Sequence, residues 1–82
     1  MKKILIIEDE EPIRRVLTRI LSKESEGYQI SEEEDGKLGL NRLLKEEFDL
    51  VLCDIKMPKM DGIEALQKAR EKEILVPFIL LT

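Results

Sequence analysis

The sequence predicts an α/β fold in which helices flank a parallel β-sheet. Two short runs, Lys3–Ile7 and Leu50–Cys53, are apolar almost throughout, which is typical of strands that are covered on both faces. Around them, apolar residues recur at steps of three and four, as they do in amphipathic helices. Strands that alternate with helices favour right-handed crossovers, so we expect a doubly wound sheet with helices on both faces.

Length and composition limit the functions that the chain can have. Its 82 residues suit one small domain, and its net charge is −4. Acidic and basic residues are mixed without a basic stripe, so we expect no direct binding of nucleic acid. No stretch reaches the roughly 18 apolar residues that span a bilayer, so we expect no membrane insertion. The single cysteine, Cys53, is interpreted as a buried thiol, and its lack of a partner fits a reducing cytoplasm.

The first helix is expected to start near Pro12 and to run to about Ser25, where Gly27 follows as a stop. Proline is well tolerated in a first helical turn because its missing N–H would be unpaired there anyway. The residues predicted to face the core are Ile13, Val16, Leu17, Ile20 and Leu21. The basic residues on the other face are interpreted as solvated surface, namely Arg14, Arg15, Arg19 and Lys23.

The middle of the chain predicts an edge strand and a second helix. Residues 28–32 alternate between apolar and polar, as a strand near a sheet edge does. Glu33, in the acidic run that follows, is interpreted as part of an exposed turn. Asp35 is positioned to cap the next helix. The leucines predicted to be buried on that helix are Leu38, Leu40, Leu43 and Leu44.

The last third of the chain predicts one more helix and one more strand. The helix should begin after Asp61-Gly62 and end near Lys72, with Asp61 as a cap and turn residue. Its predicted core residues are Ile63, Leu66 and Ala69. Residues 76–82 form a final apolar run, which predicts a fourth strand.

Carboxylates follow both of the continuously apolar strands. Glu8 and Asp9 come directly after the first, and Asp54 comes directly after the second. Adjacent parallel strands end at the same sheet edge, where ligands bind in open α/β folds, so these side chains should converge. Converging carboxylates repel one another unless a cation lies between them. A site with a small number of carboxylates and room for bound water suits Mg²⁺. Taken alone, Asp54 also fits a solvated turn residue that opens the loop at Met57-Pro58.

Three motifs together resemble the receiver domain of bacterial response regulators. They are Ile6 to Glu10, the block from Asp54 to Gly62, and the closing segment from Pro77 to Thr82, which occur in the family's order and spacing. The resemblance implies a flavodoxin-like receiver fold. It also implies that Asp54 is the phosphoacceptor, which takes a phosphoryl group from a phosphohistidine on a histidine kinase.

The resemblance assigns further roles, residue by residue. The side chains of Asp9 and Asp54 and the backbone carbonyl of Lys56 would hold Mg²⁺, with Glu8 orienting a metal-bound water. Thr82 would be the switch hydroxyl that closes onto the phosphoryl group. Such a domain is not an enzyme in the usual sense, because it catalyses only its own phosphotransfer and dephosphorylation. Part of the first helix would be a docking surface for the kinase.

In the receiver family, the fourth strand is followed by a fourth helix, a fifth strand with a lysine, and a fifth helix. Residues 1–82 match only the part before these elements, so we expect a truncated sheet of strand order 2-1-3-4. The edge at Phe78–Leu81 would then be apolar and open, which predicts homo-oligomers through the fourth strand. The block after Asp54 also resembles receivers attached to AAA+ transcription activators. A non-signalling receiver fragment, which folds or self-associates but cannot switch, stays open as an alternative.

Two other classes of function fit the sequence less well. Phosphatases of the haloacid dehalogenase type also use an aspartate at a strand end and Mg²⁺, but they need a second acid two residues later. This chain has Lys56 at that position. A calcium-binding loop would need acidic residues in alternation around a glycine, and no stretch has that pattern.

Overall fold

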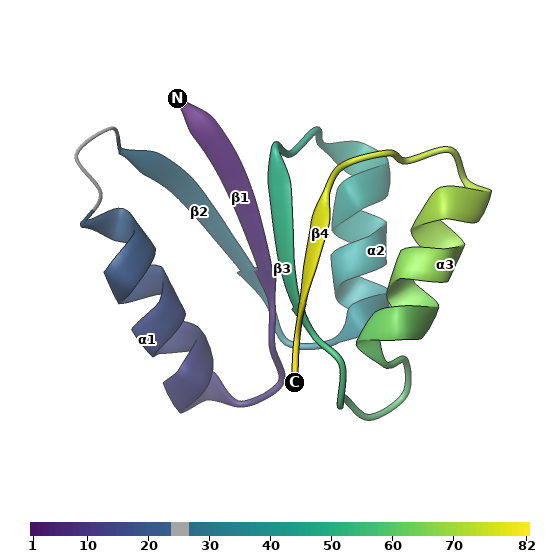
Figure 1. Ribbon diagram of the computed structural model, residues 1–82, viewed down its shortest axis with the longest axis horizontal. Helices are drawn as coiled ribbons and strands as arrows, with labels where there is room; N and C mark the ends of the chain where they lie inside the picture. Colours follow the sequence, from purple (N-terminus) through teal and green to yellow (C-terminus); the bar gives the residue numbers. More distant parts are fainter. Residues whose placement is uncertain (24–26) are drawn as a thin grey trace.

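The computed structural model describes residues 1–23 and 27–82, in which four strands and three helices alternate (Figure 1). The elements are β1 (Lys2–Ile7), α1 (Glu11–Ser22), β2 (Tyr28–Glu33), α2 (Gly36–Lys45), β3 (Leu50–Asp54), α3 (Gly62–Glu71) and β4 (Phe78–Leu81). Among these described helices, none is long and apolar enough to cross a lipid bilayer. The alternation of strand and helix confirms the predicted α/β class.

The strands form one parallel sheet in the order β2-β1-β3-β4, as the sequence predicted. The central pair is β1 and β3, in a register that places Ile7 opposite Cys53. On the outer side of β3, Asp54 lies opposite Leu81 of β4. Helix α1 covers one face of the sheet, and α2 and α3 cover the other (Figure 1). This arrangement confirms the doubly wound, flavodoxin-like architecture.

The central strands supply most of the core because both of their faces are covered. Their side chains alternate between two apolar clusters, one on each face of the sheet. The cluster beneath α2 and α3 contains Leu5, Ile7, Leu43, Phe48, Val51, Cys53 and Met57. The cluster beneath α1 contains Ile4, Ile6 and Leu52. Both continuous apolar runs of the sequence are therefore buried strands that stop at the same edge.

Helix α1 buries less of its apolar surface than its sequence predicted. Leu17 and Leu21 pack against the cluster beneath it, but Ile13, Val16 and Ile20 are 44, 52 and 56% exposed. The prediction is wrong for these three residues because α1 lies mainly over β1 and β2, and the row of its side chains that packs on the sheet contains Leu17 and Leu21. The helix ends at Ser22. The expected end near Ser25 lies outside the described residues.

The caps predicted for the other two helices are confirmed. The Oδ1 atoms of Asp35 and Asp61 accept hydrogen bonds from the backbone N–H groups of Leu38 and Glu64, each at 2.8 Å. In α2, Leu40 and Leu43 are buried as expected. In α3, Ala69 is buried as expected.

Some residues of these two helices are more exposed than predicted, because each helix buries one narrow row in which small residues are frequent. In α2 the buried row is Gly36, Gly39, Leu40 and Leu43. Leu38 and Leu44 lie off that row and are exposed. In α3 the buried row is Gly62, Ala65 and Ala69. Ile63 is therefore exposed and Leu66 is half-buried.

Candidate functional site: an acidic pocket at the carboxyl edge of the sheet

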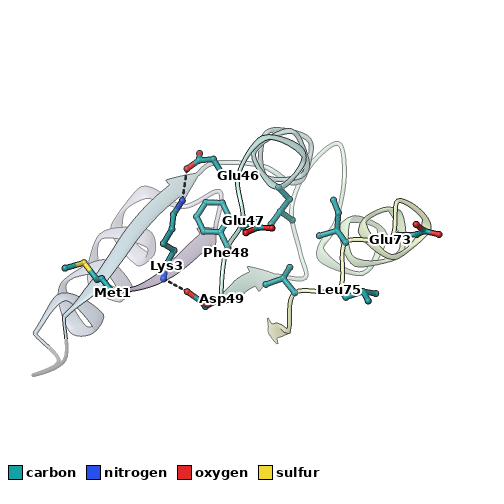
Figure 2. Close-up of a pocket in the computed structure, with 11 residues that line it drawn as sticks. Met1, Lys3, Glu46, Glu47, Phe48, Asp49, Glu73 and Leu75 are labelled. Atoms are coloured by element: carbon teal, nitrogen blue, oxygen red, sulfur yellow. Dashed lines mark hydrogen bonds and ion pairs between the residues drawn. The ribbon is translucent and has the colours of Figure 1, made fainter.

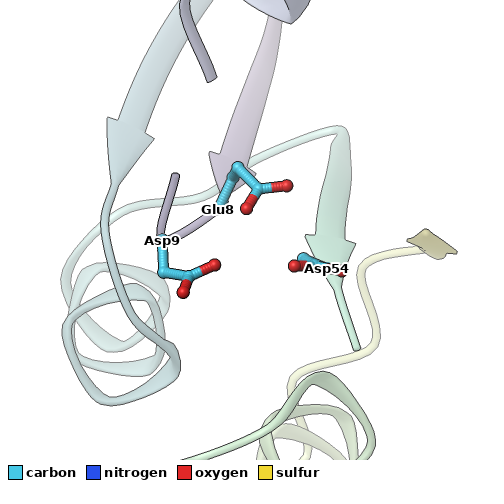
Figure 3. Close-up of side chains that lie close together, drawn as sticks. All are labelled: Glu8, Asp9 and Asp54. Atoms are coloured by element: carbon cyan, nitrogen blue, oxygen red, sulfur yellow. The ribbon is translucent and has the colours of Figure 1, made fainter. Parts of the chain in front are cut away.

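Three carboxylates meet where the two central strands end (Figure 3). Glu8 and Asp9 follow β1, Asp54 is the last residue of β3, and these strands are direct neighbours. One carboxylate oxygen of each residue lies within 4.8 Å of those of the other two. The convergence that the sequence suggested is therefore present in the fold. A single ion could contact all three side chains.

Glu8 is the buried member of this cluster, with 3% of its surface exposed. The pKa of its carboxyl group is raised from 4.5 to about 7, chiefly by burial and in smaller part by a hydrogen bond with Asp9 and the charges of Asp54 and Asp9. The backbone N–H of Glu10 opposes this shift by donating to Glu8 Oε2 at 3.1 Å. A buried acid beside two other carboxylates favours a cation, and an all-oxygen set with room for water fits Mg²⁺.

Arg14 contacts the turn that carries these acids. Its Nη1 donates to the backbone carbonyl of Glu8 at 2.8 Å, and its Nε donates to Glu32 Oε1 at 3.0 Å. The interpretation of Arg14 as a solvated residue is wrong, because only 15% of its side chain is exposed. The sequence held no signal for this contact. The contact depends on how the first turns of α1 lie over the end of β1.

The loop after β3 turns back onto Asp54. The N–H of Gly62 donates to the carbonyl of Ile55 at 2.9 Å, and a Cβ at Gly62 would lie 2.4 Å from the carbonyl oxygen of Asp54. Lys56 lies exposed within this loop, two residues beyond the end of the strand. Asp61 caps α3 and lies outside the carboxylate cluster, in agreement with its interpretation as a cap.

Thr82 follows β4 and lies at the same edge of the sheet. Leu81 is opposite Asp54 in the register, and its carbonyl accepts a hydrogen bond from the N–H of Ile55 at 3.0 Å. Thr82 is therefore one residue beyond the level of Asp54, and it is exposed. The place of Thr82 in the fold is compatible with the switch role, which stays a prediction.

The interpretation of Glu33 as part of an exposed turn is wrong. It is the last residue of β2, and its Oε2 accepts a hydrogen bond from Arg42 Nη1 at 2.8 Å. The same guanidinium contacts Ser31 Oγ at 3.0 Å and pairs with Glu46. Arg42 thus ties β2 to α2, which gives Glu33 a structural role outside the acidic pocket.

Comparison with known proteins places this architecture and pocket in one family. The family model for the response regulator receiver domain matches residues 4–82. The alkaline phosphatase synthesis transcriptional regulatory protein PhoP of Bacillus subtilis is 37% identical over 81 residues, which are 99% of this chain and 33% of PhoP. The transcriptional regulatory protein ResD of the same organism is 44% identical over 80 residues, which are 98% of this chain and 32% of ResD. The chain thus spans about a third of these two relatives.

Solved structures agree with the sequence comparison. The response regulator TrrA of Thermotoga maritima, solved in complex with Mg²⁺-BeF, is 39% identical and has a TM-score of 0.91 over all of this chain and 70% of its own. TrrA in complex with the histidine kinase ThkA has the same identity and a TM-score of 0.89, over all of this chain and 69% of its own. We conclude from the fold, the acidic pocket and these matches that the chain belongs to the family of response regulator receiver domains.

Proposed function

We propose that this domain accepts a phosphoryl group on Asp54 from a phosphohistidine of a histidine kinase, with Mg²⁺ in the acidic pocket. The observation that carries the proposal is the meeting of Glu8, Asp9 and Asp54 at the sheet edge of a receiver-family chain. TrrA, a structural neighbour, was solved with Mg²⁺-BeF and with a histidine kinase, which supports the same classes of ligand and partner here. The proposal concerns residues 1–82 as part of the receiver domain.

Each residue of the pocket has a proposed part in binding the metal. The carboxylates of Asp9 and Asp54 and the backbone carbonyl of Lys56 would hold Mg²⁺, and Glu8 would orient a water of its hydration shell. When bound, Mg²⁺ supplies positive charge that neutralises and positions the phosphoryl oxygens. The buried Glu8 and its two acidic neighbours suit this role, because a cation removes their mutual repulsion.

In the transfer step, a carboxylate oxygen of Asp54 attacks the phosphorus of the donor. A P–O bond forms, the P–N bond to the donor histidine breaks, and its electron pair stays on the imidazole nitrogen. We propose that the reaction ends in hydrolysis of the acyl phosphate by water, so the domain acts only on itself. The added charge would draw the Thr82 hydroxyl toward the phosphoryl group and bias a two-state element.

Helix α1 offers a surface on which the kinase could dock. Ile13, Val16 and Ile20 form a half-exposed apolar row, and only three residues separate the end of β1 from the start of α1, next to the pocket. An exposed apolar row of this kind is typical of a protein-binding surface. We therefore propose that a helix of the kinase packs on this row while its phosphohistidine reaches Asp54. We place this chemistry in the cytoplasm, where a lone thiol such as Cys53 stays reduced.

A second candidate function is a receiver unit that folds and self-associates without switching. In the described sheet, β4 pairs on one side only, with β3, and Ile79 on β4 is 49% exposed. Open apolar strands pair readily with other chains. We propose that the 82-residue chain forms homo-oligomers through β4. Sedimentation over a wide range of concentration tests this, and a monomer at every concentration would contradict it.

The experiment that tests the main proposal is uptake of phosphate from acetyl phosphate, read by intact mass with and without Mg²⁺. Asp54→Asn removes the acceptor, and Asp61→Asn is the matched control because it changes an aspartate outside the cluster. We expect Mg²⁺-dependent uptake by the parent chain and by Asp61→Asn, and none by Asp54→Asn. Equal uptake by Asp54→Asn would refute the acceptor role. No uptake by any folded variant would favour the second candidate function.

A further inference from the structure

We infer that Arg14 is a positioning residue for the acidic pocket. Its guanidinium holds the turn that carries Glu8 and Asp9, and Glu32 of β2 holds the guanidinium in place. The inference rests on the proposed function in one respect, because it takes the pocket to bind Mg²⁺. Arg14 of α1 and Glu32 of β2 would not touch the ion. They would nevertheless affect how tightly the pocket binds it.

The two contacts of Arg14 come from one rigid group. Nη1 donates to the backbone carbonyl of Glu8 at 2.8 Å, and Nε donates to Glu32 Oε1 at 3.0 Å. A guanidinium is planar, so a bond to Glu32 on one side fixes the direction of the N–H that points at Glu8. The Arg14 side chain is 15% exposed and that of Glu32 is 36% exposed, so the bond from Arg14 to the Glu8 carbonyl is partly shielded from water while Glu32 lies at the surface. The contact is therefore better defined than a surface ion pair.

The carbonyl of Glu8, to which Arg14 donates, lies directly before Asp9 in the backbone. The carbonyl of Glu8 and the N–H of Asp9 belong to one planar peptide unit, so fixing the carbonyl also fixes the backbone from which Asp9 projects. Glu8 takes part in two further hydrogen bonds. The N–H of Glu8 donates to the carbonyl of Glu33 at 3.1 Å, and the N–H of Glu10 donates to Glu8 Oε2 at 3.1 Å. Neither of these acts on the peptide between Glu8 and Asp9.

Charge and positioning make opposite predictions for this arginine. Arg14 is a cation beside a site for a cation, so by Coulomb repulsion alone its removal would strengthen Mg²⁺ binding. If the guanidinium positions the turn, its removal would weaken binding, because Asp9 would lose its fixed direction toward Asp54. Groups that orient metal ligands typically contribute about 10-fold or more to metal affinity. The sign of the change therefore separates the two effects.

The test is a calorimetric titration of Mg²⁺ into the parent chain, Arg14→Ala and Arg15→Ala. Arg15 is the matched control, because it is the next residue of α1 and pairs with Glu11 on the exposed surface. We expect Arg14→Ala to bind Mg²⁺ about 10-fold more weakly than the parent chain. We expect Arg15→Ala to bind it equally or more tightly. In the metal-free protein, the amide signals of Asp9 and Glu10 should shift in Arg14→Ala but not in Arg15→Ala.

The possible failures are distinguishable. Mg²⁺ binding by Arg14→Ala that equals or exceeds that of the parent chain would overturn the positioning role and leave the proposed function intact. A folded parent chain that does not bind Mg²⁺ would overturn both. If Arg14→Ala does not fold, Glu32→Gln decides, with exposed Glu34→Gln as its control for the loss of one negative charge. A greater loss of Mg²⁺ affinity in Glu32→Gln than in Glu34→Gln supports the positioning role of Arg14, and equal losses overturn it.

Discussion

The backbone of Gly62 lies against the backbone of Asp54. A Cβ atom at Gly62 would approach the carbonyl oxygen of Asp54 to 2.4 Å, a distance that real Cβ contacts essentially never reach, and its carbonyl carbon to 3.0 Å. The first residue of α3 must therefore be glycine if β3 is to end where it does. This contact links the start of a helix to the geometry of the proposed phosphoacceptor.

Gly62→Ala should therefore lower both the free energy of unfolding and the affinity of the pocket for Mg²⁺. Alanine favours a helix over glycine by about 1 kcal/mol, but overpacking against backbone typically costs about 1 to 3 kcal/mol, so we expect a net loss. The free energy of unfolding in urea and the affinity for Mg²⁺ measure the two effects. Gly39→Ala is the control for overpacking, since its Cβ would meet the buried side chain of Ile7, 2.3 Å from Cδ1, and no backbone of the pocket. Unchanged Mg²⁺ affinity in Gly62→Ala would contradict the link.

The burial of Glu8 predicts a pH dependence of stability in the absence of metal. Its pKa rises from 4.5 to about 7 on folding, chiefly because it is buried, so the folded state binds a proton more tightly than the unfolded state. Stability from this group is therefore complete below pH 4.5 and is lost as the pH rises toward 7. The loss could reach about 3 kcal/mol, since one pKa unit is worth about 1.4 kcal/mol.

Urea unfolding between pH 4.5 and 7.5 in a chelator measures this loss. Glu8→Gln should flatten the profile, because glutamine does not titrate, whereas Glu47→Gln on the exposed surface should leave it unchanged. Saturating Mg²⁺ should restore the stability at neutral pH, since the ion stabilises the ionised carboxylate. A free energy of unfolding of the parent chain that rises steadily from pH 5 to 7 would contradict the prediction.

The strands and the acidic pocket could be predicted from sequence because they depend on local pattern and topology. Continuous apolar runs such as Ile4–Ile7 fit strands covered on both faces, and parallel neighbours must end together, which brings Glu8 and Asp54 to one edge. The role of Arg14 could not be predicted because its contacts cross from α1 to the turn after β1 and to β2. A helical pattern shows only which side of a helix is apolar. How much of that side is covered, as with half-exposed Val16, depends on the packing of other elements.

Cys53 should be unreactive in the native protein. It is fully buried, and the pKa of the thiol is raised to about 12, chiefly by burial and in smaller part by the charges of Asp54, Glu8 and Asp61. Because the thiolate is the reactive form, iodoacetamide at pH 8 should label the protein only when the sheet opens. The labelling rate should then follow the urea unfolding curve, with Cys53→Ala as the blank. Rapid labelling without urea would show that β3 is accessible in the folded state.

Asp61 should stabilise the start of α3 without binding the metal. Its Oδ1 accepts the N–H of Glu64 at 2.8 Å, and loss of such a cap typically costs about 1 kcal/mol, so Asp61→Ala should be destabilised by that amount. Asp61→Asn keeps an acceptor at the cap and removes the charge, and it should be nearly as stable as the parent chain. Its Mg²⁺ affinity should stay within about twofold, because the charge is outside the cluster and screened by salt.

Asp9→Asn is the comparison that makes the test of Asp61 decisive. Asp9 belongs to the carboxylate cluster, so its amide variant should lose most of the Mg²⁺ affinity while its fold persists. If Asp61→Asn loses as much affinity as Asp9→Asn, Asp61 contributes to the metal site and its capping bond is not its main role. If Asp61→Asn binds Mg²⁺ as the parent chain does and Asp61→Ala shows only a lower stability, the four aspartates near this edge have two separate roles. Asp9 and Asp54 then form the site, and Asp35 and Asp61 start the helices beside it.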